Sequence, residues 1–297
     1  MDNTINFYIP TLDGAVFNSA LNMVKYMNQY PERFRDNVKI HSMYGAFNGT
    51  IWNGGRANFG TTPTSDVIEG TIKAANELGV ALRYTYTNSL IDETMLNDLY
   101  CNTTMKLADN GMNEVLVNSP ILEKHIRENY KNFKISLSTT TCTRGADKIN
   151  EATKNYDLVV LDYRDIKNQE ILDNIEDKDK IEIMLDENCH KDCPFRKKHY
   201  DEVAEIQLYK RGNDESKCMF EPSYSKDKKF YNNFEYNPDT TITADELYGT
   251  YIDMGFRNFK LIGRNLDVFY QFESYIYYLV KPEWKDKVRY DFYFMFF

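Results

Sequence analysis

The feature that most constrains the fold is a regular alternation of short apolar or aromatic segments with longer helix-like segments. Eight strand candidates recur along the 297 residues: INFYI, NVKIHSMY, VALRYTY, NEVLV, FKISLS, DLVVLDY, KIEIMLD and NFKLIG. Several are apolar almost throughout, as expected for parallel strands that helices cover. Eight alternating units predict an α/β fold, a (β/α)8 TIM-barrel-like domain. An open doubly wound sheet is the competing architecture, but no glycine-rich nucleotide fingerprint follows the first strand to favour it.

Helix-start signals lie between the strand candidates. Ser119-Pro120 supplies an N-cap and a proline at the first helical position. Asp92 precedes a second helical pattern in the same way, and Thr243 with Glu246 has capping-box spacing. These signals support the alternation of strands and helices.

The spacing becomes uneven only between the seventh and eighth strands, where the chain makes a long detour. This insertion spans residues 187–242 and carries three of the five cysteines. We find no internal repeat, no low-complexity run and no clear linker. Residues 1–297 are therefore expected to form one domain, with 187–242 as a cysteine-bearing insertion within it.

Polar residues just past each strand are candidates for substrate binding, because the loops after the strands form the active face of such barrels. Arginines and amides on this face suit a small-molecule substrate that is anionic or heavily hydroxylated. The alternative is that these side chains meet water, or that the arginines pair with the plentiful Asp and Glu. The expected substrate-binding residues are Tyr44, Asn53, Arg56, Asn88, Asn118, Asp162, Arg164 and Arg264.

The segment ENCHKDCPFRKKHY at residues 187–200 holds two cysteines four positions apart, Cys189 and Cys193, and Cys218 follows in the same insertion. Thiolates are the preferred ligands of iron–sulfur clusters, so a cluster fits this set best. Cys142, after the fifth strand, is either the fourth ligand or a free thiol near the pocket. Zinc is the alternative cofactor, but a second close ligand pair is missing. A catalytic Cys–His dyad and metal-free buried thiols also stay open.

The expected catalytic residues flank the cysteine pair. They are Glu187, Arg196 and His199, with His199 as a proton carrier near neutral pH.

The stretch NFKLIGRNLDVFYQFESYIYYLVKPEW resembles the segment that closes the barrel of the collagenase-like peptidases, family U32. DLVVLDYRDIKNQEILDNI likewise resembles a strand of that family that ends in a polar pair before a short helix. The following strand and ENCHKDCPFRKKHY resemble the version found in a divergent branch. The resemblance implies a (β/α)8-like barrel and, in several members, a 4Fe-4S cluster; Cys189 and Cys193 match the close pair, and Cys218 the distal cysteine. Those members hydroxylate RNA bases or the ubiquinone ring without molecular oxygen, and others have been called peptidases. The larger family's own cysteine block is absent, which leaves the fourth ligand open.

The expected function is therefore that of an iron–sulfur-dependent oxidoreductase. It would perform oxygen-independent hydroxylation, or a related modification, of a small polar or aromatic molecule or a nucleobase. The alternatives are a peptidase-like hydrolase, although neither GxSxG nor HExxH occurs, and a non-catalytic partner subunit that holds an iron–sulfur cluster or zinc.

Charge and hydropathy limit the partners and the location. A net charge of −9 disfavours nucleic acid as a substrate without excluding it. No apolar run approaches the roughly 20 residues of a membrane span, and the first residues lack a signal-peptide pattern, so we expect a cytoplasmic protein that does not act at a membrane. The aromatic C-terminus RYDFYFMFF either packs on the barrel or forms the interface of a homo- or hetero-oligomer.

Overall fold

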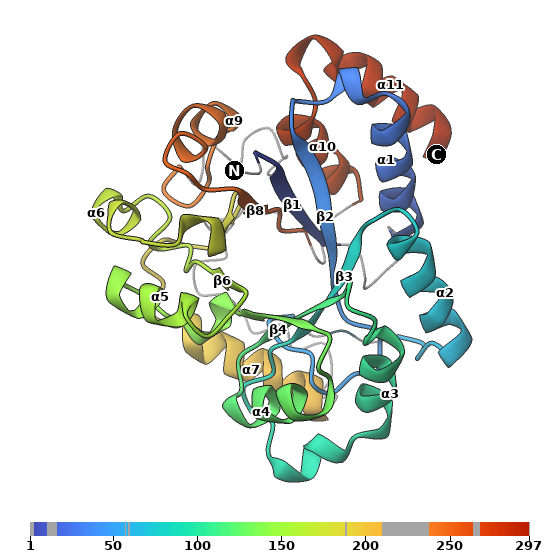
Figure 1. Ribbon diagram of the computed structural model, residues 1–297, viewed down its shortest axis with the longest axis vertical. Coiled ribbons are helices and arrows are strands. Elements are labelled where there is room, and N and C mark those ends of the chain that lie inside the picture. The colour runs from blue at the N-terminus through green and yellow to red at the C-terminus, as the bar shows by residue number, and fades with distance from the viewer. Residues whose placement is uncertain are drawn as a thin grey trace.

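The fold is a closed barrel of eight parallel strands. A computed structural model of the chain describes residues 3–10, 17–56, 58, 60–187, 189–209, 238–263 and 268–296. The strands pair in chain order, and β1 also pairs with β8, which closes the sheet on itself (Figure 1). The predicted (β/α)8 barrel is confirmed, and the open sheet is wrong.

Each expected strand segment overlaps one observed strand, and β1 and β2 run one residue beyond their segments. The strands are β1 (Ile5–Pro10), β2 (Val38–Gly45), β3 (Ala81–Tyr86), β4 (Glu114–Val117), β5 (Lys134–Leu137), β6 (Leu158–Val160), β7 (Ile181–Met184) and β8 (Asn258–Lys260). The helices are α1 (Phe17–Gln29), α2 (Ser65–Asn76), α3 (Leu99–Ala108), α4 (Pro120–Asn129), α5 (Ala146–Thr153), α6 (Gln169–Asp173), α7 (Arg196–Tyr209), α9 (Ala244–Glu246), α10 (Val268–Leu279) and α11 (Lys285–Phe296).

Two of the expected helix starts are confirmed. The Ser119 hydroxyl accepts a hydrogen bond from the Leu122 N–H at 3.4 Å, and Pro120 is the first residue of α4. The Thr243 hydroxyl accepts from the Glu246 N–H at 3.1 Å, while the Glu246 carboxylate accepts from the Thr243 N–H at 2.7 Å. Both arrangements satisfy N–H groups that have no partner within the helix.

The expectation for Asp92 needs correction, because this residue does not open one long helix. Its carboxylate accepts from the N–H groups of Thr94 and Met95 and caps a 3-10 turn, η2 (Glu93–Asn97). Asp98 then caps α3 by accepting from the Cys101 N–H at 2.7 Å. Two aspartates six residues apart each hold a local backbone turn, so the segment divides between them.

The hydrophobic core lies between the strands and the helices that surround them. Strand residues that point outward, such as Phe7, Leu82 and Ile183, are fully buried against the helix layer. Figure 1 shows α1 to α6 arranged around the barrel, with α10 and α11 beside α1. This layer is the usual core of the fold.

The interior of the barrel carries charges where such barrels usually carry bulky branched apolar side chains. Arg83 donates to the Glu114 carboxylate at 2.6 Å and also pairs with Glu182. Lys260 lies 3.4 Å from the other oxygen of Glu182, and His41 contacts Glu114 at 2.8 Å. All four members of the Arg83–Glu114–Glu182–Lys260 network are buried. Two cations therefore balance two carboxylates inside the barrel.

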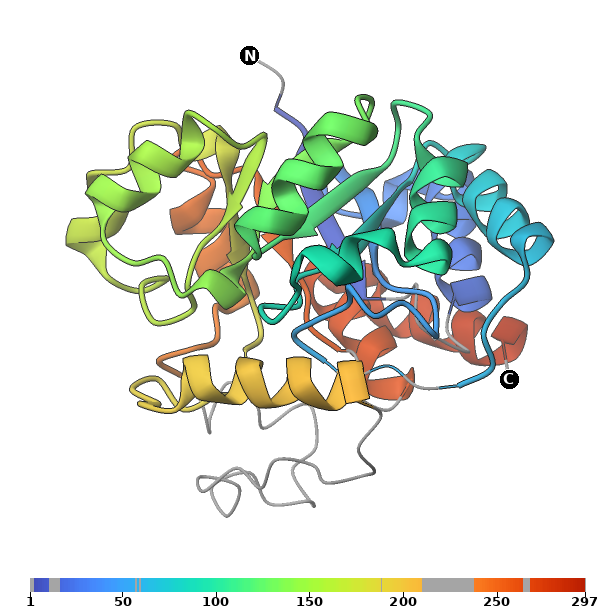
Figure 2. The same cartoon turned by 90° about the horizontal axis from the view of Figure 1, so that it is seen from below.

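Helix α7 belongs to the insertion after β7 and lies across the end of the barrel where the strands terminate. Figure 2 shows it running beneath the barrel, on the side opposite the N-terminus. The segment after β3 holds it there: the Asn88 amide donates to the Ala204 carbonyl at 3.1 Å, and the Ser89 hydroxyl donates to Asp201 at 2.6 Å. The rest of the insertion, residues 210–237, lies outside the described residues.

The C-terminal helix α11 is packed on one side only. Val288 and Phe292 are buried, whereas Tyr290 and Phe294 are 58% and 74% exposed. The interface expected at the aromatic C-terminus stays a prediction. Among the described helices, none combines the length and the apolar character that crossing a lipid bilayer requires.

Candidate functional site

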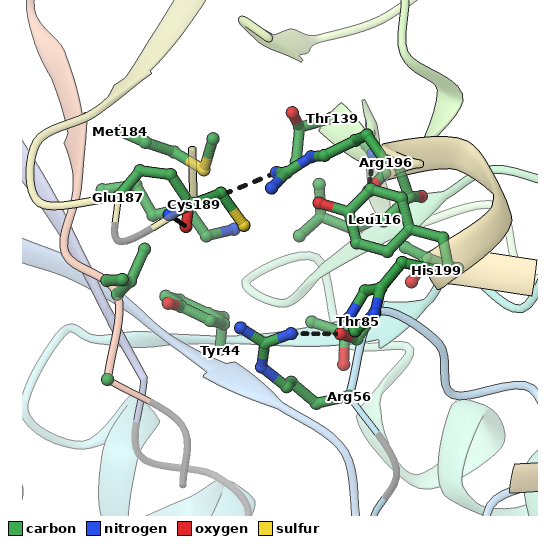
Figure 3. A pocket seen from close by; sticks show the side chains of 18 residues that line it. Tyr44, Arg56, Thr85, Leu116, Thr139, Met184, Glu187, Cys189, Arg196 and His199 are labelled. Carbon is green, nitrogen blue, oxygen red and sulfur yellow. Dashed lines mark hydrogen bonds and ion pairs between the residues drawn. The ribbon is translucent and has the colours of Figure 1, made fainter. Parts of the chain in front are cut away.

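The candidate site is a cavity of about 120 Å³ at the mouth of the barrel, under α7 (Figure 3). Its walls come from the C-terminal ends of β2, β3, β4, β5, β7 and β8 and from the first turns of α7. The lining residues are Tyr44, Gly55, Arg56, Thr85, Thr87, Leu116, Ser138, Thr139, Thr140, Met184, Glu187, Cys189, Arg196, His199, Tyr200, Lys260, Ile262 and Gly263.

This cavity brings together part of the residue set expected from the sequence. All three expected catalytic residues line it, and so do two expected substrate-binding residues and one expected metal ligand: Glu187, Arg196, His199, Tyr44, Arg56 and Cys189. Seven expected residues are described but do not line it: Asn53, Asn88, Asn118, Asp162, Arg164, Cys142 and Cys193. Cys218 and Arg264 lie outside the described residues.

Arg196 is buried and contacted on several sides. It is 5% exposed, and its guanidinium lies 4.1 Å from the ring centre of Tyr163 and 4.8 Å from that of Tyr200. It donates to Glu187 at 3.2 Å, while the Tyr163 hydroxyl is fixed by donating to the His190 carbonyl at 2.6 Å. The Arg196 Nε is buried and has no hydrogen-bond partner among the described residues. A buried donor left unpaired costs about 1–3 kcal/mol, so this nitrogen lowers the stability that the surrounding contacts provide.

Glu187 is held as a carboxylate. Burial disfavours its charged form, but Arg196 and Arg56 outweigh this effect and lower the pKa of the Glu187 carboxyl. One carboxylate oxygen accepts from Arg196, and the other accepts from the Cys189 N–H at 3.1 Å. Glu187 therefore neutralises and orients Arg196, and it is not suited to carry protons near neutral pH.

Arg56 reaches the cavity from the segment after β2, through a close approach of two loops. A Cβ atom on Gly54 would lie 2.5 Å from the Thr87 carbonyl, so only glycine fits, and Gly55 has a positive φ of 78°. The Asn53 amide donates to the Arg56 carbonyl at 3.0 Å, which fixes the backbone there. Asn53 thus positions Arg56 without lining the cavity.

The Arg56 guanidinium has no carboxylate partner within 4 Å among the described residues. It donates to the Gly55 carbonyl at 3.2 Å and forms no ion pair with another residue that the structure describes. Figure 3 shows its side chain directed into the cavity, beside Tyr44. A half-buried arginine without a counter-charge is the part of the site most open to an anionic ligand.

His199 lies on the same helix face as Arg196, three residues further along. Burial, followed by the positive charges of Arg56 and Arg196, lowers the pKa of the His199 imidazole below its usual 6.5. The ring is therefore neutral near pH 7 and can accept a proton from a bound molecule.

The floor of the cavity is the top of the charged barrel interior. Lys260 ends β8 and lies 4.0 Å from the ring centre of Tyr44. Its ion pair with Glu182 joins it to the Arg83 network below. Tyr44 is fixed because its hydroxyl donates to the Leu261 carbonyl at 2.7 Å.

A hydroxyl-rich wall follows β5. The Ser138 hydroxyl accepts from the Thr140 hydroxyl at 3.0 Å, and the Asn118 amide donates to Thr140 at 2.8 Å. Asn118 therefore supports this wall from behind. Thr139 lines the cavity, and its hydroxyl is buried without a hydrogen-bond partner among the described residues.

The other expected polar residues make contacts within the loops and with α7 instead of lining the cavity. Asn88 bonds the Ile51 and Ala204 carbonyls and so holds α7 in place. Arg164 makes a two-point contact with the buried Asp162, both bonds being 2.8 Å long. This is the salt bridge that the sequence left open as the alternative to substrate binding.

The cysteines do not form a metal site within the part of the chain that the structure describes. There, no group of three or more His, Cys, Asp or Glu side chains is arranged to hold a metal ion. The Cys189 thiol lines the cavity, whereas Cys142 and Cys193 are half-buried outside the lining. Burial and then the nearby Glu187 raise the pKa of Cys189 to about 12, so the thiol is protonated. The described donors thus do not fit a four-thiolate cluster.

Sequence reasoning missed Lys260 and Tyr200 as site residues. Lys260 had a signal, because a lysine stands within the apolar segment NFKLIG at a position that faces inward. Tyr200 lies one turn after Arg196 on α7, which also had a readable signal.

Comparison with known proteins adds little to this picture. No protein-family model matches the chain, and no curated protein is significantly similar to it. Among solved structures, this chain is similar to a U32 peptidase, Mk0906, with 13% sequence identity and a TM-score of 0.47. The structural match covers 88% of this chain and 93% of the Mk0906 chain. The barrel assignment rests on the strand pairing of this chain and not on that similarity.

Proposed function

We propose that this protein is an enzyme that binds a small anionic substrate at the barrel mouth and moves a proton to or from it. The observation that carries the proposal is the Arg56 guanidinium, which faces the cavity without a carboxylate partner among the described residues. Arg196, pre-oriented by Glu187 and two tyrosine rings, supplies a second cation. Fixed guanidinium groups bind carboxylate and phosphate oxygens well, since little order is lost on binding.

Proton transfer is assigned to His199. It lies in the cavity lining with both arginines, and its lowered pKa keeps the ring neutral at pH 7. A neutral imidazole close to an anionic substrate can remove a proton and return it in a later step. The arginines would stabilise negative charge that develops on the substrate when the proton leaves.

The size of the cavity favours a small molecule over a peptide. An engineered cavity of about 150 Å³ holds one benzene molecule, and the volume here is about 120 Å³. A peptidase-like function has support only in the description of the solved U32 peptidase, and the protonated Cys189 thiol is a poor nucleophile. We therefore place the peptidase reading second.

An iron–sulfur oxidoreductase is a more specific function than the described residues support. It depends on Cys218, outside the described residues, and on Cys142 and Cys193, which do not converge with Cys189 on the cavity. No step proposed above uses a cluster.

The test is ligand-induced stabilisation of the intact chain against a set of small carboxylates and inorganic phosphate. A ligand at 100 times its Kd stabilises the folded state by about 2.7 kcal/mol. We expect Arg56→Gln to lose this stabilisation. Lys197→Gln is the matched control, because Lys197 is the neighbour of Arg196 on α7 but its side chain is 74% exposed.

Two results separate binding from chemistry. His199→Gln should keep the stabilisation by the anion and lose proton exchange on the bound molecule, followed by NMR in deuterated water. The proposal fails if no anion stabilises the wild-type chain, or if Arg56→Gln binds as tightly as the wild type.

A further inference from the structure

The two tyrosine rings that stack on Arg196 differ in what their hydroxyl groups contact. The Tyr163 hydroxyl donates to the His190 carbonyl at 2.6 Å, and Tyr163 does not line the cavity. Tyr200 lines the cavity, and its hydroxyl makes no hydrogen bond to another residue that the structure describes. A phenylalanine ring would offer Arg196 the same face for stacking. Stacking on Arg196 therefore does not account for the Tyr200 hydroxyl.

The Tyr200 hydroxyl faces the cavity. Tyr200 is 8% exposed, yet its hydroxyl is not one of the polar atoms of the described chain that are buried from solvent without a partner. Burial raises the pKa of the Tyr200 phenol, and the other groups that act on this pKa all line the cavity: Arg196, Glu187, Cys189 and Arg56. Charges act most strongly at short range, and the charge of an ionised phenol sits on its oxygen. The oxygen therefore lies among the cavity walls that these side chains form.

A proton acceptor and a neutral hydrogen-bond donor are neighbours on α7. The ring centres of His199 and Tyr200 lie 6.1 Å apart, and both residues line the cavity. Burial lowers the pKa of the His199 imidazole and raises that of the Tyr200 phenol. Near pH 7 the imidazole is therefore neutral and the phenol keeps its proton. One small molecule in the cavity can contact both groups.

We propose that Tyr200 is a catalytic residue: its hydroxyl donates a hydrogen bond to a carbonyl oxygen of the substrate while His199 removes a proton from the carbon beside that carbonyl. This inference rests on the proposed function and names the substrate class of the same site, a small anion with an acidic C–H next to a carbonyl group. In the step, the C–H bond breaks and its proton passes to the imidazole. The electron pair of that bond forms the C=C bond of an enolate, and the carbonyl π pair moves to the oxygen. No oxidant or reductant takes part.

A carbonyl group is the partner that this pair of side chains suits. A carbon releases a proton to an imidazole only when the electron pair that stays behind can move onto an electronegative atom. A donor already in place stabilises the negative charge that develops there, in a site partly removed from water. Its hydrogen bond strengthens as the charge grows, so it acts on the transition state more than on the bound substrate. We therefore expect the Tyr200 hydroxyl to affect the rate and not the affinity.

The experiment measures binding and C–H exchange separately on the intact chain at pH 7.5. The probes are pyruvate and levulinate, which carry C–H groups beside a ketone, and propionate, which has no ketone. Calorimetric titration gives the affinity, and NMR in deuterated water follows the loss of the proton signals beside the carbonyl at saturating probe. We expect the wild type to exchange these protons in at least one of the two ketones and to exchange none in propionate.

Tyr200→Phe keeps the ring on Arg196 and removes only the hydroxyl. We expect its exchange rate at saturating probe to fall about 100-fold, as for the loss of one preorganised donor, while the Kd changes by less than about threefold. Tyr84→Phe is the matched control. The Tyr84 hydroxyl also has no hydrogen-bond partner among the described residues, but it is buried and Tyr84 does not line the cavity. This variant should exchange at the wild-type rate.

The outcomes distinguish this inference from the proposed function. If Tyr200→Phe exchanges as fast as the wild type, or loses affinity as much as it loses rate, the catalytic assignment of Tyr200 is overturned. If the probes bind, Arg56→Gln abolishes that binding and the wild type exchanges no C–H, the anion site stands and the carbonyl substrate class is overturned. If no probe binds, or Arg56→Gln binds as tightly as the wild type, both proposals fall together.

Discussion

Replacing Arg83 with methionine should destabilise the protein strongly, and more so at high pH than at low pH. Arg83 is fully buried between Glu114 and Glu182. Burial opposes the charge on Glu114, but Arg83 and then His41 lower the pKa of this carboxyl from 4.5 to about 2. Because one pKa unit corresponds to about 1.4 kcal/mol, this drop alone represents roughly 3 kcal/mol of stability.

Breaking a buried ion pair by removing one partner typically costs about 3–5 kcal/mol, which agrees with that figure. For a domain of this size we expect a fall in Tm of about 10 °C at pH 8. In the wild type, the depressed pKa of Glu114 supplies stability that is present above pH ~4.5 and is lost as the pH falls toward 2. In the variant, burial without Arg83 raises the carboxyl pKa above its unfolded value, so the penalty shrinks as the pH falls and the group is protonated.

The measurement is urea unfolding followed by circular dichroism at pH 8 and pH 5. Arg127→Met, at a partly exposed site on α4, is the control and should change stability by less than about 1 kcal/mol. Adding Glu114→Gln and Glu182→Gln to Arg83→Met should restore most of the loss, because no buried carboxylate then lacks a partner. An equal loss at both pH values, or a loss below about 1 kcal/mol at pH 8, would refute this reasoning.

Two further predictions concern other residues. Burial raises the pKa of the Asp186 carboxyl to about 7, although hydrogen bonds from the Ile262 N–H and the Ser274 hydroxyl lower it. Because this pKa is above the value in the unfolded chain, the free energy of unfolding falls as the pH rises from about 4 through 7. Asp186→Asn should therefore stabilise the protein at pH 8 and leave it unchanged at pH 4, and an equal effect at both values in thermal unfolding would contradict the assigned pKa. If the cysteines hold a 4Fe-4S cluster, anaerobic purification should give a brown protein with about four irons and four sulfides per chain. Colourless protein after reconstitution would remove the iron–sulfur reading, and zinc analysis of the same sample tests the alternative metal.

The barrel was predictable because its signal is local and repeated. Apolar segments such as DLVVLDY predict a strand that helices cover. Eight such segments at this spacing are compatible with only a few folds. The charged interior was not predicted, although its signal is present: Arg83, Glu114 and Glu182 each stand inside a strand segment. A charge in a strand does not say which face it occupies, and only the register places Arg83 directly opposite Glu114.

The sequence predicts at which end of the barrel the candidate site lies, but it does not predict which individual side chains line it. Tyr44, Arg56 and Glu187, which were selected because they end or follow a strand segment, lie in the cavity lining, and their role stays a prediction. The same criterion also selected Asn88 and Arg164, whose side chains turn toward α7 and Asp162. Short amides and paired arginines find backbone or carboxylate partners nearby, and these contacts are decided by loop geometry that spacing does not reveal.

The charged interior is better explained by the site above it than by stability. A well-packed apolar replacement of a buried ion pair is often neutral or stabilising, so ion pairs alone give a barrel no reason to hold them. Here Glu182 is shared between Arg83 below and Lys260 in the cavity floor. Without that carboxylate, burial would favour a neutral Lys260 amine and remove one positive charge from the anion site. The variant that combines Arg83→Met, Glu114→Gln and Glu182→Gln should consequently keep most of the wild-type stability, yet bind the small anion at least tenfold more weakly. If it binds the anion as tightly as the wild type does, the network serves the barrel and not the ligand.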